Sequence, residues 1–106
     1  MNQKYSENEP SRAEVDAIEG LAVIEFGTNW CGICAAAQPA ISAAFAAYPH
    51  IRHLKVSDGP GQPLGRSFKV KLWPTLIFMK RGREVDRLVR PQDREPISAA
   101  LDRLVR

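Results

Sequence analysis

Two cysteines, Cys31 and Cys34, are the residues whose type and spacing are best suited to chemistry in this 106-residue chain. They stand three positions apart, as Cys31-Gly32-Ile33-Cys34, at the start of an alanine-rich segment whose pattern predicts a helix. A helix N-terminus presents unpaired amide hydrogens and partial positive charge, which favour the nucleophilic thiolate. A thiol one turn further along can attack a mixed disulfide formed by the first. The pair therefore predicts thiol–disulfide exchange.

A CxxC pair is also half of many zinc sites, so metal binding is the second chemistry to consider. A zinc site needs two more ligands, and the candidates are His50, His53 and the carboxylates. Their spacing does not repeat the CxxC pattern. We therefore expect no metal site and no organic cofactor, only a redox-active disulfide between Cys31 and Cys34.

Length and composition predict one domain in a reducing compartment. The chain is 44% hydrophobic and 25% charged, as is usual for globular proteins, and two cysteines make no multi-bridge framework. The uncharged stretch between Glu25 and Arg52 is too weakly apolar for a membrane span, and the acidic N-terminus lacks the pattern of a signal peptide. We expect a cytoplasmic monomer away from membranes, where disulfides are rare unless they are catalytic.

Charge is distributed unevenly along the chain. Residues 1–31 carry two basic and six acidic side chains, whereas residues 50–106 carry thirteen basic and six acidic ones. The basic residues are dispersed over predicted strands, turns and a helix, with few aromatic residues between them. This pattern favours a solvated face or an acidic protein partner, and we expect no nucleic-acid binding.

Hydrophobic periodicity predicts the elements that position the cysteines. Residues 1–10 are polar and predict a flexible N-terminal tail, and residues 11–106 predict a single domain. The predicted strands are residues 21–26, 51–56, 75–79 and 84–89, and the predicted helices lie within residues 11–20, 31–48, 63–68 and 93–105. This order predicts an α/β fold with a central mixed sheet of four strands and helices on both faces.

Over about residues 20–105 the chain resembles thioredoxin. The resemblance is carried by LAVIEFGTNWCGIC at residues 21–34, WPTLIFMKRG at residues 73–82, and Pro39 within the helix after the cysteines. It implies a thioredoxin-like fold in which the usual first strand is missing or replaced by the N-terminal tail and helix. It also implies a protein-disulfide oxidoreductase in which Cys31 attacks the substrate and Cys34 resolves the mixed disulfide.

Glu25 occupies the position of the family's buried acid behind the second cysteine, where aspartate is usual. A carboxylate in an apolar strand loses solvation, so we expect burial to raise its pKa. The resemblance then implies a proton relay for Cys34, directly or through a water. The alternative is a structural ion pair with Lys55 or His53 on the neighbouring predicted strand.

The resemblance also implies a substrate surface around the cysteines. Pro74 matches the family's cis-proline, whose loop faces the disulfide and pairs with an extended substrate. Trp73 before it either narrows the substrate groove or folds back as packing, and Arg90 stands near a glycine that lines the surface in the family. The implied substrate-binding residues are Trp30, Gly32, Ile33, Trp73, Pro74, Thr75 and Arg90.

Two departures from the family bear on function. Ile33 replaces the usual proline between the cysteines, and Gly27 replaces a second aromatic residue in the preceding loop. We expect a reductase of protein disulfides that receives electrons from a reductase or a small thiol. The alternatives are a disulfide oxidase or isomerase of the same fold, or a binding adaptor whose redox pair is regulatory.

Overall fold

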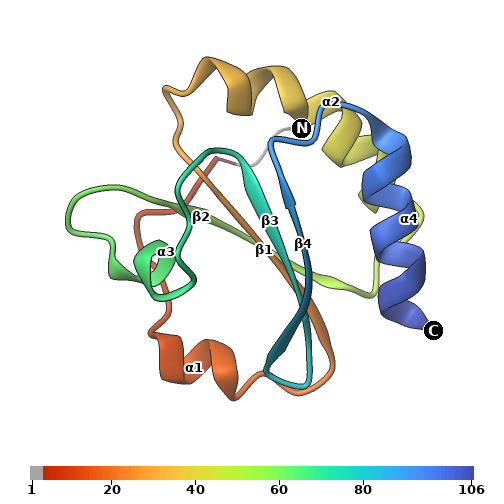
Figure 1. Cartoon of the computed structure of the whole chain (residues 1–106), viewed down its shortest axis with the longest axis horizontal. Helices are drawn as coiled ribbons and strands as arrows, with labels where there is room; N and C mark the ends of the chain where they lie inside the picture. The colour runs from red at the N-terminus through yellow and green to blue at the C-terminus, as the bar shows by residue number, and fades with distance from the viewer. Residues whose placement is uncertain (1–3) are drawn as a thin grey trace.

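A computed structural model describes residues 4–106 and contains the eight predicted elements in the predicted order (Figure 1). The strands are β1 (Leu21–Gly27), β2 (Arg52–Ser57), β3 (Thr75–Lys80) and β4 (Arg83–Val89). The helices are α1 (Arg12–Asp16), α2 (Gly32–Phe45), α3 (Pro63–Ser67) and α4 (Arg94–Val105). Each strand lies within one residue of its predicted bounds, whereas α2 ends at Phe45, before the predicted end of that helix.

The four strands form one mixed sheet in the order β2-β1-β3-β4. β1 pairs with β2 in parallel and with β3 in antiparallel orientation, and β3 and β4 are antiparallel. β1 is therefore central and almost completely buried, which explains its continuous apolar run. Phe26 near the end of β1 faces Thr75 at the start of β3, so the loops next to these two residues lie at the same end of the sheet.

The helices cover both faces of the sheet, as predicted. α2 and α4 pack on the face that carries Val23 and Phe78, and α1 and α3 pack on the face that carries Ile24 and Ile77. Successive side chains of a strand point to opposite faces. Glu25 therefore points to the same face as Val23, toward α2, the helix that begins at the cysteine pair.

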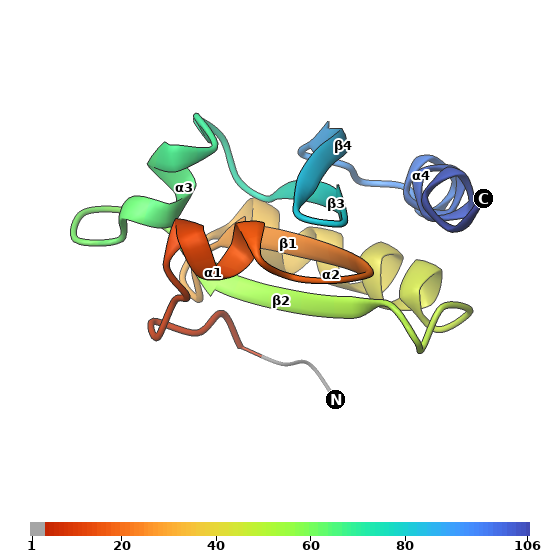
Figure 2. The same ribbon diagram turned by 90° about the horizontal axis from the view of Figure 1, so that it is seen from below.

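The N-terminal segment differs from the sequence expectation of a flexible tail. Residues 1–3 of that expected tail lie outside the described residues, but the segment from Lys4 onward runs along the outer edge of β2 (Figure 2). The Ser6 amide donates to the Lys55 carbonyl at 3.0 Å, and the Ser57 amide donates to the Ser6 carbonyl at 2.8 Å. Tyr5 is only 6% exposed. A single aromatic residue and the open edge of β2 are enough to anchor a segment whose average composition is polar.

In the part of the chain from Lys4 to Arg106, no helix is both long and apolar enough to cross a membrane. The longest helix, α2, has 14 residues, whereas a span requires about 20.

Candidate active site

The two cysteines lie at the N-terminal end of α2, as the sequence predicts. Cys31 is the N-cap residue, and its Sγ accepts a hydrogen bond from the Cys34 amide at 3.2 Å. Both thiols are free; Cys31 is partly exposed, whereas Cys34 is only 1% exposed. The sulfur that solvent reaches is therefore also the one at the positive end of the helix.

Two tryptophans join the cysteine loop to the loop before β3. Trp30 is 77% exposed, and its ring meets the Trp73 ring edge to face, with centroids 6.0 Å apart. The Trp73–Pro74 peptide bond is cis, as the resemblance implies. The contact brings the cis-proline loop beside the residue that precedes Cys31.

The side chain of Trp73 is tied back to the domain. Its indole Nε1 donates to Asp58 Oδ2 at 2.8 Å, and its carbonyl accepts from Arg90 Nε at 2.9 Å. The Arg90 amide also donates to the Pro74 carbonyl at 2.8 Å, and Arg90 has a φ of 53°. The ring packs against the α1 and α3 side of the sheet. Trp73 therefore packs against the domain, which is one of the two alternatives weighed from the sequence, and its ring also contacts Trp30.

The remaining predicted substrate-binding residues fall into two groups. Gly32 and Ile33 are exposed in the first turn of α2, and a Cβ atom on Gly32 would meet nothing within 4 Å. Thr75 is buried, and its hydroxyl donates to the Leu72 carbonyl at 2.6 Å. Its side chain thus braces the cis-proline loop and is not available at the surface.

Glu25 is fully buried at the centre of a hydrogen-bond network. Its Oε1 lies 2.8 Å from His53 Nε2, and its Oε2 accepts from the Tyr5 hydroxyl and, at 2.9 Å, from Gln38 Nε2. Lys55 Nζ reaches the network by donating to Gln38 Oε1 at 2.5 Å. The structure therefore contains the ion-pair partner on the neighbouring strand that the sequence offered as the alternative. His53 contacts Glu25 directly, whereas Lys55 is connected to it through Gln38.

These partners decide the protonation state of Glu25. Burial by itself raises the pKa of the carboxyl group. Four neighbours lower it more, so that the pKa of Glu25 lies below its ordinary value; in decreasing order of effect they are His53, Lys55, Gln38 and Tyr5. The sequence-based expectation of a raised pKa is wrong, because the sequence indicates burial of the carboxylate but not the donors that fold around it.

The pKa of the Cys34 thiol is shifted in the opposite direction, above its ordinary value. Burial raises the pKa of the Cys34 thiol to about 11, and the hydrogen bond with Cys31 adds to this effect. The nearby Thr28 backbone and Tyr5 side chain lower the pKa of the same thiol, but by less than burial raises it. Cys34 is thus protonated at neutral pH, and its conversion to a nucleophile requires a proton acceptor.

Three residues of the site escaped the sequence analysis: Tyr5, Gln38 and Asp58. Each belongs to a segment whose pattern predicts something else, namely a tail, a helix face and a loop. One signal was available for Tyr5, because it is the only aromatic residue in the first ten and Gly27 leaves out an aromatic residue of the family. The Tyr5 ring lies directly beside Gly27.

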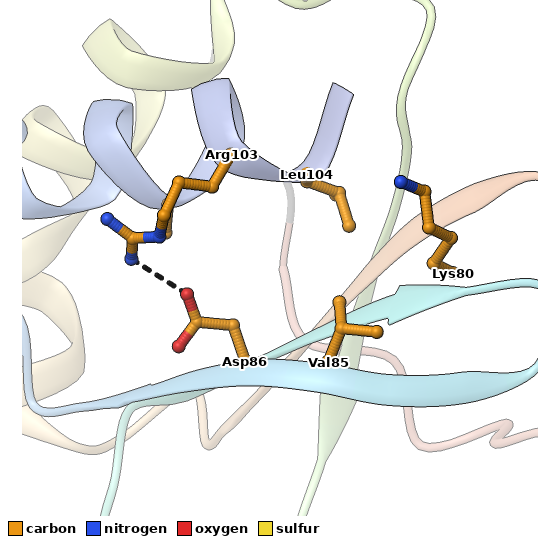
Figure 3. A pocket seen from close by; sticks show the side chains of 6 residues that line it. Lys80, Val85, Asp86, Arg103 and Leu104 are labelled. Atoms are coloured by element: carbon orange, nitrogen blue, oxygen red, sulfur yellow. Dashed lines mark hydrogen bonds and ion pairs between the residues drawn. The ribbon is translucent and has the colours of Figure 1, made fainter. Parts of the chain in front are cut away.

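Other parts of the described structure show no second site of this kind. Among residues 4–106, no group of three or more His, Cys, Asp and Glu side chains is placed to hold a metal ion. A hollow between β4 and α4 is lined by Lys80, Val85 and Leu104, and beside them Arg103 pairs with Asp86 at 2.8 Å (Figure 3). None of the residues that line it is a cysteine.

Comparison with known proteins gives the same family from three directions. The thioredoxin family model matches residues 3–103. The chain is 36% identical over 78 residues to thioredoxin of Chlamydia trachomatis serovar D, covering 74% of this chain and 76% of that protein. It is 33% identical over 69 residues to thioredoxin H-type of Fagopyrum esculentum, covering 65% of this chain and 60% of that protein.

A solved structure extends the likeness to nearly the whole chain. Reduced thioredoxin 2 from Pseudomonas aeruginosa PAO1 superposes with a TM-score of 0.90 at 51% identity, covering 99% of this chain and 97% of that one. Its likeness includes the N-terminal segment, which lies outside the motifs that carried the resemblance. The chain belongs to the thioredoxin family, a family of protein-disulfide oxidoreductases, and its two cysteines stand at the active-site position.

Proposed function

We propose that the protein is a protein-disulfide reductase in which Cys31 is the attacking cysteine and Cys34 the resolving one. The observation that carries this proposal is the contrast between the two sulfurs. Cys31 is partly exposed at the N-terminus of α2, and Cys34 is buried one turn away, with its amide 3.2 Å from Cys31 Sγ. Cys31 attacks a substrate disulfide, Cys34 then displaces the substrate thiolate, and the Cys31–Cys34 disulfide remains.

The proposed substrate surface surrounds Cys31. Trp30, Gly32 and Ile33 offer an exposed, mostly apolar contact, and the cis-proline loop offers backbone groups to an extended peptide. Arg90 and Trp73 hold that loop in place, and the buried Thr75 hydroxyl supports it by donating to the Leu72 carbonyl. We propose disulfide-bearing proteins as substrates, a reductase or small thiol as electron donor, and the cytoplasm as the location, where such a couple is kept reduced.

Glu25 is proposed as the proton acceptor for Cys34 in the resolving step. The pKa of Glu25 lies below its ordinary value, so the side chain is an unprotonated carboxylate at neutral pH and can accept a proton. Its partner His53 lines a surface groove together with Ile41 and Phe45, which gives the proton a route to solvent.

The midpoint potential of the Cys31–Cys34 couple tests the direction of exchange. Thiol alkylation in graded dithiothreitol buffers should give a value at or below the glutathione poise, about −260 mV. A value near −180 mV or above, roughly that of protein disulfide isomerase, would contradict the reductase and favour the oxidase or isomerase.

Single-cysteine variants test the assignment of the two sulfurs. Cys34→Ser should accumulate a mixed disulfide with a protein substrate, because the resolving thiol is gone, whereas Cys31→Ser should form none. If Cys31→Ser is the variant that traps substrate, the two roles are reversed. A cellular role that survives the double variant would favour the adaptor.

A further inference from the structure

Tyr5 is fastened to the loop that carries the cysteines. Its amide donates to Asn29 Oδ1 at 2.8 Å, and Asn29 Nδ2 donates back to its carbonyl at 3.1 Å. Asn29 stands two residues before Cys31, and the next residue of the segment, Ser6, is bonded to β2. The position of Tyr5 is thus set from two sides, by the active-site loop and by the edge of the sheet.

The ring of Tyr5 occupies space that a side chain at position 27 would need. A Cβ atom on Gly27 would lie 2.6 Å from Tyr5 Cζ, closer than such contacts occur. The same Cβ atom would lie 2.8 Å from the Tyr5 hydroxyl oxygen and 2.8 Å from Cys34 Sγ. The phenol oxygen and the resolving sulfur therefore both border the space beside Gly27, and glycine at this position is what admits the ring.

The hydroxyl of Tyr5 also contacts the buried acid. It donates to Glu25 Oε2 and accepts from Gln38 Nε2 at 3.1 Å. Burial, and then the charge of Glu25, raise the pKa of Tyr5 well above its ordinary value, so the phenol keeps its proton throughout the physiological range. One neutral hydroxyl group thus contacts the carboxylate and, with the thiol that has to lose a proton, borders the space beside Gly27.

We propose that Tyr5 is the link in proton transfer between Cys34 and Glu25. The proposal rests on the function proposed above and deepens its resolving step. The Cys34 thiol gives its proton to the phenol oxygen while the phenol proton moves to Glu25 Oε2. Tyr5 stays neutral, Glu25 becomes a carboxylic acid, and the hydroxyl then donates to the new Cys34 thiolate. Cys34 Sγ bonds to Cys31 Sγ, the bond from Cys31 to the substrate sulfur breaks, and the substrate leaves as a thiolate.

The charged groups around Tyr5 agree with this role. Lys55 Nζ lies 4.9 Å from the centre of the Tyr5 ring and donates to Gln38, which orients the amide that contacts both Tyr5 and Glu25. His53 contacts the far oxygen of the same carboxylate. These groups keep Glu25 ionised in the resting state, so its proton-accepting site is free. Because they stabilise the carboxylate, they also make proton transfer to it uphill, and its acid form is short-lived.

A two-step thiol reaction tests the proposal. Reduced protein mixed with one equivalent of 5,5′-dithiobis(2-nitrobenzoate) releases one thionitrobenzoate when Cys31 attacks and a second when Cys34 resolves. Tyr5→Phe keeps the ring beside Gly27 and removes only the hydroxyl. We expect the first phase to be unchanged and the second to slow by roughly 10- to 100-fold, with its pH midpoint shifted upward.

Tyr48→Phe is the matched control, because Tyr48 lies beyond the C-terminal end of α2, about 20 Å along the helix from the cysteines. It should leave both phases unchanged. A second phase in Tyr5→Phe with the rate and pH profile of the unaltered protein would overturn the proposal. Equal slowing of both phases would also overturn it, because that is the result of a merely structural role.

The unaltered protein offers a second measurement that does not depend on whether a variant folds. The resolving phase should slow in D2O relative to the attacking phase, because a proton moves in it; equal isotope effects would contradict the proposal. The proposed function fails by a different result. It fails if the unaltered protein releases no second equivalent, or if Cys31→Ser still releases the first, whatever Tyr5→Phe shows.

Discussion

The indole nitrogen of Trp73 donates a hydrogen bond to Asp58 Oδ2 at 2.8 Å, and this contact ties the cis-proline loop to the segment after β2. Asp58 is itself held to the cysteine side of the sheet, because its amide donates to the Gly27 carbonyl at 2.9 Å. Asp58 thus connects the cis-proline loop, through its carboxylate, to the end of β1 before the cysteine loop, through its backbone amide, and it lies outside both motifs.

Asp58→Ala should destabilise the protein by about 1–3 kcal/mol, because it leaves the partly buried indole N–H without its acceptor. Urea unfolding measures the change. Asp93→Ala is the matched control: Asp93 is exposed and its side chain makes no capping hydrogen bond at the start of α4. Equal unfolding free energies for the two variants would contradict a role of Asp58 in holding Trp73.

Glu25→Gln should change how stability depends on pH. The pKa of Glu25 is lowered in the folded state, so the unfolded chain takes up the proton first, near the ordinary glutamate value of about 4.3. The carboxylate therefore contributes stability above that pH, and the contribution is lost as the pH falls through the lower folded value. In the variant, the free energy of unfolding should fall less steeply as the pH is lowered below about 4.3. Urea unfolding at a series of pH values measures this dependence.

Glu95→Gln, at an exposed position in the first turn of α4, controls for the general loss of a negative charge. If the free energy of unfolding falls as steeply with decreasing pH in Glu25→Gln as in Glu95→Gln, the pKa of Glu25 is not lowered by its network.

Iodoacetamide should label Cys31 in preference to Cys34. Cys31 is partly exposed, whereas Cys34 is buried and burial raises the pKa of its thiol to about 11, so few molecules present an accessible thiolate there at pH 8. Peptide mass spectrometry after a short reaction measures the ratio. Labelling in concentrated guanidinium, where both thiols are exposed, is the control, and equal labelling of the folded protein would contradict the arrangement.

Arg90→Gly should be more stable than Arg90→Ala. Arg90 has a φ of 53°, a conformation that costs a residue with a side chain about 1 kcal/mol and glycine almost nothing. Both variants lose the hydrogen bond from Nε to the Trp73 carbonyl, so the difference between them isolates the backbone. Urea unfolding should separate them by about 1 kcal/mol, and identical curves would exclude backbone strain at this position.

Local pattern alone predicted the fold and the reacting pair. The strands of this sheet are short apolar runs, and the alanine-rich helix begins directly after Cys31, so both are encoded in neighbouring residues. The spacing of Cys31 and Cys34 fixes their separation along one helical turn, which makes their partnership local as well. For this reason the element order, the mixed sheet and the cysteine chemistry were accessible from the sequence.

Only the tertiary structure decided the surroundings of Cys34. Tyr5, Glu25 and His53 lie 20 or more residues from one another, and the contacts between them exist only because β1, β2 and the N-terminal segment lie side by side. The direction of the Glu25 pKa depends on donors from the N-terminal segment, α2 and β2, and it was expected to be the reverse. Hydropathy records whether a side chain is buried, but the charge that a buried group carries is set by the partners that folding brings within hydrogen-bonding distance.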